Sequence, residues 1–189
     1  YHHGEGLEQS YKRAIKWYRR SAKTIEVAQY QMGILYFNGF GVSVDYKKAM
    51  SWFKRAADQG MIDAFVFIGL LYQEGKGVNI DYDEAMKYYN LAAKQNDANA
   101  KLCIGMLYND GLGVKQNFAE AVQWFKKAAE QGVSNAQFNM GLVFDIGEGV
   151  LKNSKEAIRW YQLAVEQGNV SAMINLGIIP HIDVSGGFT

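Results

Sequence analysis

The sequence predicts an all-α solenoid made of stacked helical hairpins, and three observations support this prediction. Columns of alanine, glycine and aromatic residues recur every 36 residues along the 189-residue chain. Within each repeat the apolar residues follow the period of a helix and not the alternation of a strand. Glycine pairs and capping residues separate the helices at fixed offsets. A single hairpin cannot bury both of its faces, so neighbouring hairpins must stack.

The repeat is defined by columns of identical residues. An alanine column and a glycine column run through the chain in phase, and a Gly-x-Gly-Val segment follows in four units. The columns are Ala28, Ala64, Ala100, Ala136 and Ala172, and Gly33, Gly69, Gly105, Gly141 and Gly177; the segments are 39–42, 75–78, 111–114 and 147–150. This number of columns in phase excludes coincidence.

These columns set the expected domain organisation, an array over residues 1–179 followed by a non-repeat tail. The array has partial repeats at its two ends and four full repeats between them. The repeats are 1–27, 28–63, 64–99, 100–135, 136–171 and 172–179, and the tail is 180–189. The opening residues fit the frame with one deletion, so His2 and His3 belong to the array, which we expect to be part of a longer one. Pro180 should end the last helix near Ile178.

The first helix of each repeat carries one apolar stripe. Ala28, Met32, Leu35 and Tyr36 lie at i, i+4, i+7 and i+8 and therefore share a face. The first helices are expected at 26–38, 62–74, 98–110, 134–146 and 170–179. The glycine inside each helix costs about 1 kcal/mol relative to alanine. We expect the close approach of a neighbouring helix to offset that cost.

The second helix of each repeat has a stripe of its own, which in the first full repeat includes Trp52 and Phe53. These helices are expected at 10–23, 45–59, 81–95, 117–131 and 153–167. The expected N-caps are Ser10, Asp45, Asp81, Asn117 and Asn153, with capping boxes completed by Glu84, Glu120 and Glu156. The expected C-terminal residues are Gly60, Asn96, Gly132 and Gly168. The aromatic residues expected to be largely buried are Tyr72, Tyr108, Trp52, Trp124 and Trp160.

The combined pattern is Ala-x-x-x-φ-Gly-x-φ-Tyr-x-x-Gly-x-Gly-Val, followed by Asp or Asn, Ala and an aromatic pair. It resembles the Sel-one-like repeat, a relative of the tetratricopeptide repeat, over nearly the whole chain. The resemblance implies a right-handed α/α superhelical solenoid that serves as an adaptor in multiprotein assemblies. Some bacterial members carry a disulfide in each repeat. This chain has one cysteine, so properties of that branch are not expected here.

A candidate partner-binding surface follows one side of the first helices. In tetratricopeptide relatives this side lines the concave groove. The row, hereafter the groove row, combines acids, amides and apolar residues and contains no Lys or Arg. Its candidate binding residues are Gln31, Asn38, Asp63, Phe67, Leu70, Glu74, Asn99, Cys103, Met106, Asp110, Asn135, Asn139 and Asn175, and Val27, Ile34, Leu142, Ile146, Ser171 and Ile178 complete it. Amides can donate to and accept from an extended peptide. A merely solvated face is the alternative reading.

Several chemistries find no support in the sequence. The formal net charge is +1 and no basic stripe exists, so no nucleic-acid partner is expected. No run of 18 apolar residues is present, so no membrane insertion is expected. His2, His3, His181 and Cys103 lack metal-ligand spacing, and no histidine is placed to activate the cysteine. We expect no catalytic residue, metal or cofactor, and a single cysteine favours a reducing, cytoplasmic compartment.

The sequence therefore predicts a protein–protein interaction scaffold that binds a peptide or protein on the groove row. Asp63, Glu74 and Asp110 bring negative charge to that row, so apolar or basic segments should be preferred. An alternative is an accessory or regulatory domain of an enzyme or signalling protein. In that reading the array is a structural spacer and its groove is not used.

Overall fold

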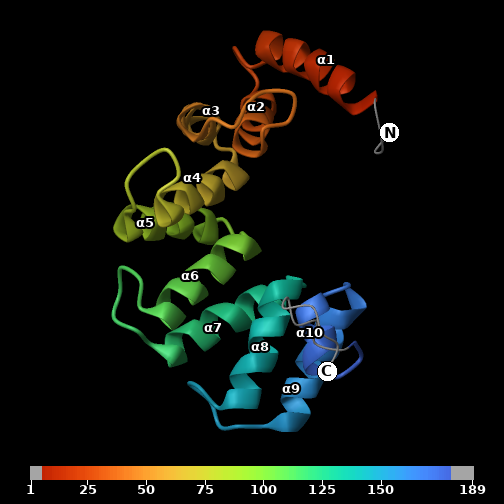
Figure 1. The fold of residues 1–189 in the computed structure, drawn as a ribbon. Helices are drawn as coiled ribbons and strands as arrows, with labels where there is room; N and C mark the ends of the chain where they lie inside the picture. Colours follow the sequence, from red (N-terminus) through yellow and green to blue (C-terminus); the bar gives the residue numbers. More distant parts are fainter. Residues whose placement is uncertain (1–5, 180–189) are drawn as a thin grey trace. The chain divides into compact units, whose positions relative to one another are not determined.

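The computed structural model describes residues 6–179, which form ten helices and no strand (Figure 1). The helices are α1 (Gly6–Ser21), α2 (Glu26–Asn38), α3 (Tyr46–Asp58), α4 (Ile62–Glu74), α5 (Tyr82–Lys94), α6 (Ala98–Asp110), α7 (Phe118–Ala129), α8 (Ser134–Ile146), α9 (Ser154–Glu166) and α10 (Val170–Asn175). The all-α prediction is confirmed. None of these helices is long and apolar enough to cross a membrane.

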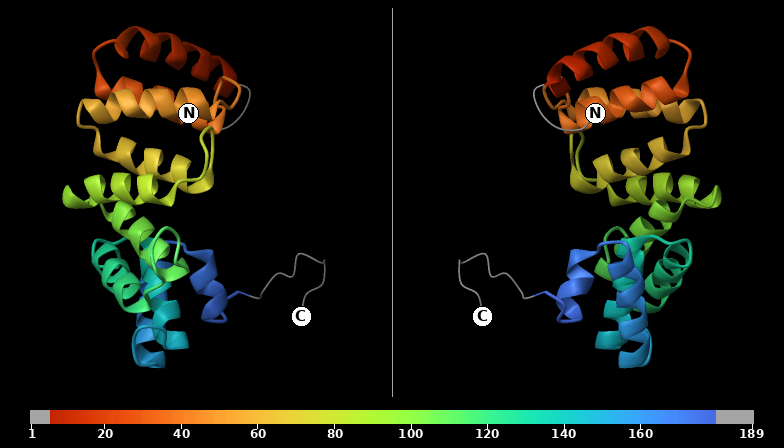
Figure 2. Two further views of the ribbon diagram at one scale, coloured as in Figure 1. Left: turned by 90° about the vertical axis from the view of Figure 1, so that its left-hand side faces the viewer. Right: turned by 90° about the vertical axis from the view of Figure 1, so that its right-hand side faces the viewer.

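The chain divides into two compact units, residues 1–97 and 98–189. In the first unit, α2 pairs with α3 and α4 with α5, and α1 lies against α2; Figure 2 shows these five helices in successive layers. In the second unit, α6 pairs with α7 and α8 with α9, and α10 packs on α9. Within each unit the second helix of one hairpin also contacts the first helix of the next. Both units are therefore stacks of hairpins.

Helix boundaries agree closely with the expected ones in the central repeats. Helices α2, α4, α6 and α8 match residue for residue, and α3, α5, α7 and α9 match within two residues. The ends of the array differ. Helix α10 stops at Asn175 because Gly177 adopts the left-handed conformation at φ 67°, which ends the helix before Ile178. Pro180 lies outside the described residues.

The N-cap prediction for Ser10 is wrong. Helix α1 begins at Gly6, so Ser10 lies inside the helix. The stretch Leu7-Glu8-Gln9 holds no glycine or proline, so nothing in it stops the helix from extending toward the N-terminus. The expected start followed the alignment with later repeats, in which an Asp or Asn stands directly before the second helix.

The other four N-caps are confirmed. The side chains of Asp45, Asp81, Asn117 and Asn153 each accept a backbone N–H from the first turn of their helix. The expected C-terminal residues are confirmed too: Asn96 is left-handed at φ 68°, as are the glycines that end the other second helices. These short polar and glycine residues set where each second helix begins and ends.

The expected capping boxes are not formed as predicted. In a capping box the glutamate side chain accepts the backbone N–H of the N-cap residue. Here that N–H donates to the carbonyl oxygen of the first helix in the same hairpin. The bonds are Asp45 to Tyr36 (2.9 Å), Asp81 to Tyr72 (3.0 Å), Asn117 to Tyr108 (2.9 Å) and Asn153 to Phe144 (2.8 Å). Glu84 and Glu156 instead pair with Lys87 and Arg159. One recurring backbone bond therefore closes each hairpin.

The glycines inside the first helices provide room for an aromatic ring, which confirms that a neighbouring helix approaches closely there. A Cβ atom built on Gly69 would lie 2.5 Å from Cε1 of Tyr89, well inside contact distance. Gly33, Gly105 and Gly141 face Phe53, Phe125 and Tyr161 in the same way. Each glycine thus leaves space for an aromatic ring from the second helix of the same hairpin to pack against the first helix.

The five aromatic residues expected to be largely buried keep part of their surface exposed, and none of them is fully enclosed. Tyr72, Tyr108, Trp52, Trp124 and Trp160 are half-buried. The fully packed rings are the ones seated against the glycines, Phe53, Tyr89, Phe125 and Tyr161, none more than 3% exposed. In each adjacent aromatic pair on a second helix, the second member points at the first helix. The first member is the preceding residue, so it points to a different side of the helix and keeps part of its ring exposed to solvent.

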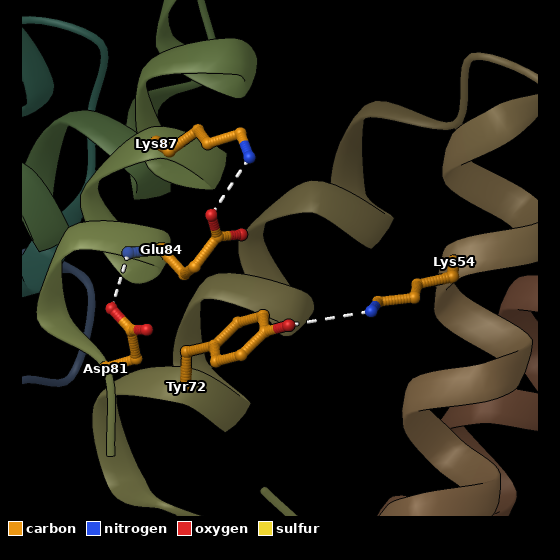
Figure 3. A network of polar contacts seen from close by, with 5 residues as sticks. All are labelled: Lys54, Tyr72, Asp81, Glu84 and Lys87. Carbon is orange, nitrogen blue, oxygen red and sulfur yellow. Dashed lines mark hydrogen bonds and ion pairs between the residues drawn. The ribbon is translucent and has the colours of Figure 1, made fainter. Parts of the chain in front are cut away.

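Polar contacts link successive hairpins at the surface and in the interior. Lys54 of α3 donates to the Tyr72 hydroxyl of α4 (3.5 Å), and Figure 3 shows this bond beside the Asp81 cap. The amide of the exposed Gln59 donates to Oε1 of the buried Gln29 (2.6 Å), and Gln29 donates to the Ala22 carbonyl (3.0 Å). Gln167 and Gln137 repeat the first of these bonds in the second unit at 2.7 Å. The buried Gln29 and Gln137 thus each connect the C-terminal ends of the helices before and after their own.

Candidate binding groove

In the first unit, the groove row lies on α2 and α4. Asn38, Asp63 and Glu74 are exposed, whereas Gln31 and Leu70 are half-buried. The Asn38 amide donates to the Ile34 carbonyl one turn earlier (3.2 Å). The row is therefore accessible to a partner along both helices, although one amide is partly engaged within its own helix.

Phe67 belongs to an aromatic cluster that joins α2, α3 and α4. Its ring lies 4.9 Å from that of Phe53, 5.4 Å from Phe37 and 5.8 Å from Tyr30, between centroids. Edge-to-face and stacked contacts of this kind stabilise the packing of the helices. Phe67 is half-buried, so it offers a partner only one side of its ring.

Glu74 carries less free negative charge than the sequence suggested, because the turn that follows α4 brings a lysine to it. The Lys76 ammonium lies 2.6 Å from Glu74 Oε2 and 5.4 Å from the ring centroids of both Phe37 and Tyr46. The hydrogen bond with Glu74 raises the pKa of Lys76. Glu74 is thus paired within the hairpin.

Asp63 lies in a locally negative environment. Burial, and then the charge of Asp97, raise the pKa of the Asp63 carboxyl above its ordinary value. Burial, followed by the charges of Asp63 and Asp97, raises the pKa of the Tyr30 hydroxyl to about 12. A cation brought to this end of α4 would relieve the repulsion between the two carboxylates.

In the second unit, the groove row lies on α6, α8 and α10. Asn99, Asp110, Asn135 and Asn175 are exposed, and Cys103 and Asn139 are half-buried. Two of the amides make contacts within the unit. Asn169 donates to Asn135 Oδ1 (3.2 Å), and Asn175 donates to the Tyr161 hydroxyl (3.0 Å). Each of them keeps part of its hydrogen-bonding capacity for a partner.

A cavity of about 270 Å³ opens in this unit between α6 and α8. Five residues of the groove row line it: Met106 and Asp110 from α6, and Asn139, Leu142 and Ile146 from α8. Phe125 of α7 and Val143 of α8 complete its apolar wall. The spacing of the row along two successive first helices is what brings these side chains together.

Two polar residues of the cavity were missed by the sequence analysis. Asn109 precedes Asp110 and donates to its Oδ1 (2.9 Å), and Gln116 in turn donates to the Asn109 carbonyl (2.7 Å). Glu148 lies between Gly147 and Gly149 in the turn after α8. Its position between two glycines was visible in the sequence, but its direction depends on how the turn folds back over α8.

The side chains that line the cavity form no catalytic arrangement. Its lining combines apolar side chains with two amides and two carboxylates, and it holds no His, Cys, Ser, Lys or Arg. Across residues 6–179 no group of three or more His, Cys, Asp or Glu side chains could hold a metal ion. Cys103 is half-buried elsewhere on α6.

The chain is similar to proteins of known structure. A Sel1 repeat protein from Oxalobacter formigenes is 40% identical, with a TM-score of 0.82, over 89% of this chain and 69% of that one. A protective antigen present in uropathogenic Escherichia coli strains, which displays an SLR fold, is 39% identical with a TM-score of 0.79. That match covers 87% of this chain, which spans only 35% of the antigen's length. Helicobacter pylori cysteine rich protein B, at 24% identity and a TM-score of 0.56, over 71% of this chain and 98% of that one, shares the fold alone.

A family model described as Sel1 repeat matches residues 1–23, 27–61, 66–97, 97–133 and 134–169. No curated protein matches the chain. The matched segments follow the hairpins described above, from the opening helix to the end of α9, and together they cover most of the sequence. Repeats of this type generally mediate protein–protein interactions. The chain belongs to the Sel1 repeat family.

Proposed function

We propose that this chain is an interaction scaffold that binds a protein partner, or an extended segment of one, along the groove row of its first helices. The observation that carries the proposal is the cavity between α6 and α8, which five residues of that row line. If the row only faced solvent, its residues would not be expected to line a common cavity. Here polar and apolar groups converge as they do in binding sites.

The chemistry of the row supports a preference for apolar or basic segments. Asp63 and Asp110 contribute negative charge, and no Lys or Arg belongs to the row. Leu70, Met106 and Leu142 contribute apolar surface. An acidic segment would be repelled and left without a partner for its charge, which a partly desolvated site cannot tolerate. The proposed ligand therefore has neutral or positive side chains where it crosses the row.

Site-specific photo-crosslinking tests the proposal. A photoreactive phenylalanine analogue is placed at Asn99 or Asn135, two exposed positions of the row, and at Lys127 or Lys155, two exposed positions on second helices. The proteins are irradiated in the native cell extract and the adducts identified by mass spectrometry. We expect one recurring partner from the two row positions and none in common with the second-helix positions.

The contrary outcomes are distinct. If the same partner is captured only from Lys127 and Lys155, the second helices form the interface and the proposal is wrong. If none of the four positions gives a specific adduct, the array acts as a spacer between other parts of a longer protein. The length of the uropathogenic Escherichia coli relative, of which this chain spans about a third, makes that second function worth testing.

A further inference from the structure

We infer that the cavity between α6 and α8 binds a single arginine side chain of the partner. This inference rests on the proposed function and names the chemistry of one subsite. The apolar wall would pack on the aliphatic stem of the arginine, and the polar side would receive its guanidinium. Four observations support it: the lining, the charge, the hydrogen-bonding groups and the size.

The lining divides into an apolar and a polar part. Met106, Leu142 and Ile146 give an open apolar surface, with Met106 37% and Ile146 59% exposed. Asp110 and Glu148 bring two carboxylates from different elements, the end of α6 and the turn after α8. Long cationic side chains bury a hydrocarbon stem while keeping a charged head near polar groups. The two parts of this cavity match the two parts of such a side chain.

The two carboxylates at the cavity have no cation of their own in the part of the chain that the structure describes. Within residues 6–179 neither Asp110 nor Glu148 forms an ion pair, in contrast to Glu74, which Lys76 neutralises in the first unit. Glu156 and Glu130, acids of the neighbouring second helices, likewise have cations of their own, Arg159 and Lys126. The two carboxylates at this cavity are therefore available to an incoming cation.

The hydrogen-bonding groups favour a guanidinium. The Asn109 amide donates to one oxygen of Asp110, which fixes the carboxylate and leaves its second oxygen free to accept. Asn109 and Asn139 also line the cavity, and the oxygen of a side-chain amide can accept further hydrogen bonds. A guanidinium carries five N–H donors in a rigid plane and has no acceptor, so a site made of acceptors on several sides suits it better than a compact ammonium group.

The size of the cavity points to one side chain. Its volume of about 270 Å³ lies just below the range of about 300–1,000 Å³ typical of sites that enclose a small molecule. The hollow is thus too small for most cofactors and suits a single long residue of a bound segment. The exposed Asn99 and Asn135, at the N-terminal ends of α6 and α8, remain for contacts with the rest of that segment.

The test uses defined tripeptides as probes and Met106 as the reporter. Protein labelled with ¹³C on the methionine methyl groups is titrated with Ac-Ala-Arg-Ala-NH₂, its citrulline analogue and its glutamate analogue, and Met106→Leu assigns the reporter signal. Citrulline has nearly the shape of arginine without its charge. We expect the arginine peptide to shift the Met106 signal saturably and the citrulline peptide to bind about threefold to tenfold more weakly. The glutamate peptide should give no saturable shift.

A pair of charge-matched variants locates the effect. Asp110→Asn/Glu148→Gln should bind arginine and citrulline peptides within about twofold of each other, because the charge contribution is gone. Asp145→Asn/Glu130→Gln removes the same net charge from exposed positions that do not line the cavity and should keep the arginine preference. Circular dichroism should show both variants equally helical.

Three results would overturn the inference: equal binding of arginine and citrulline peptides to the wild-type protein, no saturable shift at Met106, or equal loss of preference in the two double variants. If any of these occurs while crosslinks still form at Asn99 and Asn135, the arginine subsite is rejected and the scaffold function stands. Absence of those crosslinks is the separate failure of the proposed function.

Discussion

At the scale of single residues, a missing side chain sets the distance between the two helices of a hairpin. Gly69 has no Cβ, and the Tyr89 ring occupies the space where one would lie. Tyr89 is fully buried, and its hydroxyl donates to Gln73 Oε1 at 2.7 Å. The glycine weakens helix α4 locally, and the seated ring more than offsets that cost through burial and a satisfied hydroxyl.

We predict that Gly69→Ala destabilises the protein despite the better helix propensity of alanine. Propensity favours alanine by about 1 kcal/mol, whereas overpacking a core costs about 1–3 kcal/mol. Urea denaturation should show a net loss. In a Tyr89→Leu background the ring is absent, so Gly69→Ala should become neutral or stabilising. A destabilisation of the same size in both backgrounds would show that the ring is not the cause.

The adjacent residues Tyr88 and Tyr89 should differ in their contribution to stability. Truncating a fully buried aromatic residue costs about 3–5 kcal/mol, so Tyr89→Ala should approach that loss. Tyr88 is half-buried and stacks on Tyr72 with 5.9 Å between ring centroids, so Tyr88→Ala should cost clearly less. Chemical denaturation of the two variants under one set of conditions gives the comparison. Equal losses would contradict the assigned orientation of α5.

The stability of the chain should fall in strong base partly because of Tyr30. Its pKa is raised from 10.0 to about 12 in the folded chain, by burial first and then by Asp63 and Asp97. Between these values the unfolded chain has lost a proton that the folded chain keeps, so the free energy of unfolding falls as pH rises. Tyr30→Phe removes this titration. Urea midpoints measured from pH 10 to 12 should fall less steeply in Tyr30→Phe, and identical slopes would refute the assignment.

At the scale of helices and turns, the N-cap residue of each second helix both caps that helix and hydrogen-bonds to the first helix of the same hairpin. Asp81 accepts the Glu84 N–H with its side chain (2.9 Å) and donates its own N–H to the Tyr72 carbonyl (3.0 Å), as Figure 3 shows for the cap. The side-chain bond belongs to α5 and the backbone bond joins α5 to α4. Substitution of the side chain therefore removes the cap and leaves the hairpin closure in place.

We predict that Asp81→Ala costs about 0.5–2 kcal/mol, the usual loss for an N-cap. Glu84→Gln should cost little, because the Asp81 N–H is bonded to Tyr72 and does not depend on the Glu84 carboxylate. The Glu84–Lys87 ion pair lost with it is exposed, and such pairs contribute about 0–1 kcal/mol. Thermal unfolding distinguishes the two variants. A loss for Glu84→Gln as large as that for Asp81→Ala would restore the capping-box interpretation.

At the scale of the whole molecule, the stability of each unit is spread over hairpins that contact their neighbours within that unit. Both units contain the same three features: an aromatic ring packed against a helix glycine, an N-capped second helix, and a backbone hydrogen bond between the two helices of a hairpin. The groove rows of the two units nevertheless differ. The row in residues 1–97 is dominated by an internal aromatic cluster and a neutralised Glu74. The row in residues 98–179 lines a cavity whose two carboxylates form no ion pair with any described residue. Repeats that share one fold can therefore differ in the side chains on their surface.

We predict that partner binding weakens as salt rises and depends on the acids of the row. Exposed charge pairs contribute about 0–1 kcal/mol each, so charge should tune selectivity more than strength. On a peptide array, the wild type should favour apolar or basic segments, and Asp63→Lys/Asp110→Lys should lose or reverse that preference. Glu74→Lys is a less direct test because Glu74 is already paired with Lys76. A wild-type preference for acidic peptides would refute the selectivity we propose.

The sequence by itself determined the repeat, the helix boundaries, four of the N-caps and the left-handed C-terminal residues. These features depend on residues within a few positions of each other, and the same local signals recur in each repeat. It also predicted that the residues of the groove row share one side of the first helices, because the helical period fixes which residues share a face. Its errors lay at Ser10 and Ile178, where the array ends and no full repeat supports the alignment, and in the capping boxes, because the N-cap N–H groups donate to the preceding helix.

Only the tertiary structure decided which side chains meet. It selected Tyr89 over Tyr88 and Phe53 over Trp52 as the buried rings, and it directed the N-cap N–H groups to carbonyls of the preceding helix. It also joined Gln59 to Gln29, and it brought Asn109 and Glu148 to the cavity. Each outcome depends on the distance and angle between helices, which packing of all the side chains sets jointly. Local periodicity fixes the faces of a helix but carries no information about the exact contacts that a neighbouring helix makes with them.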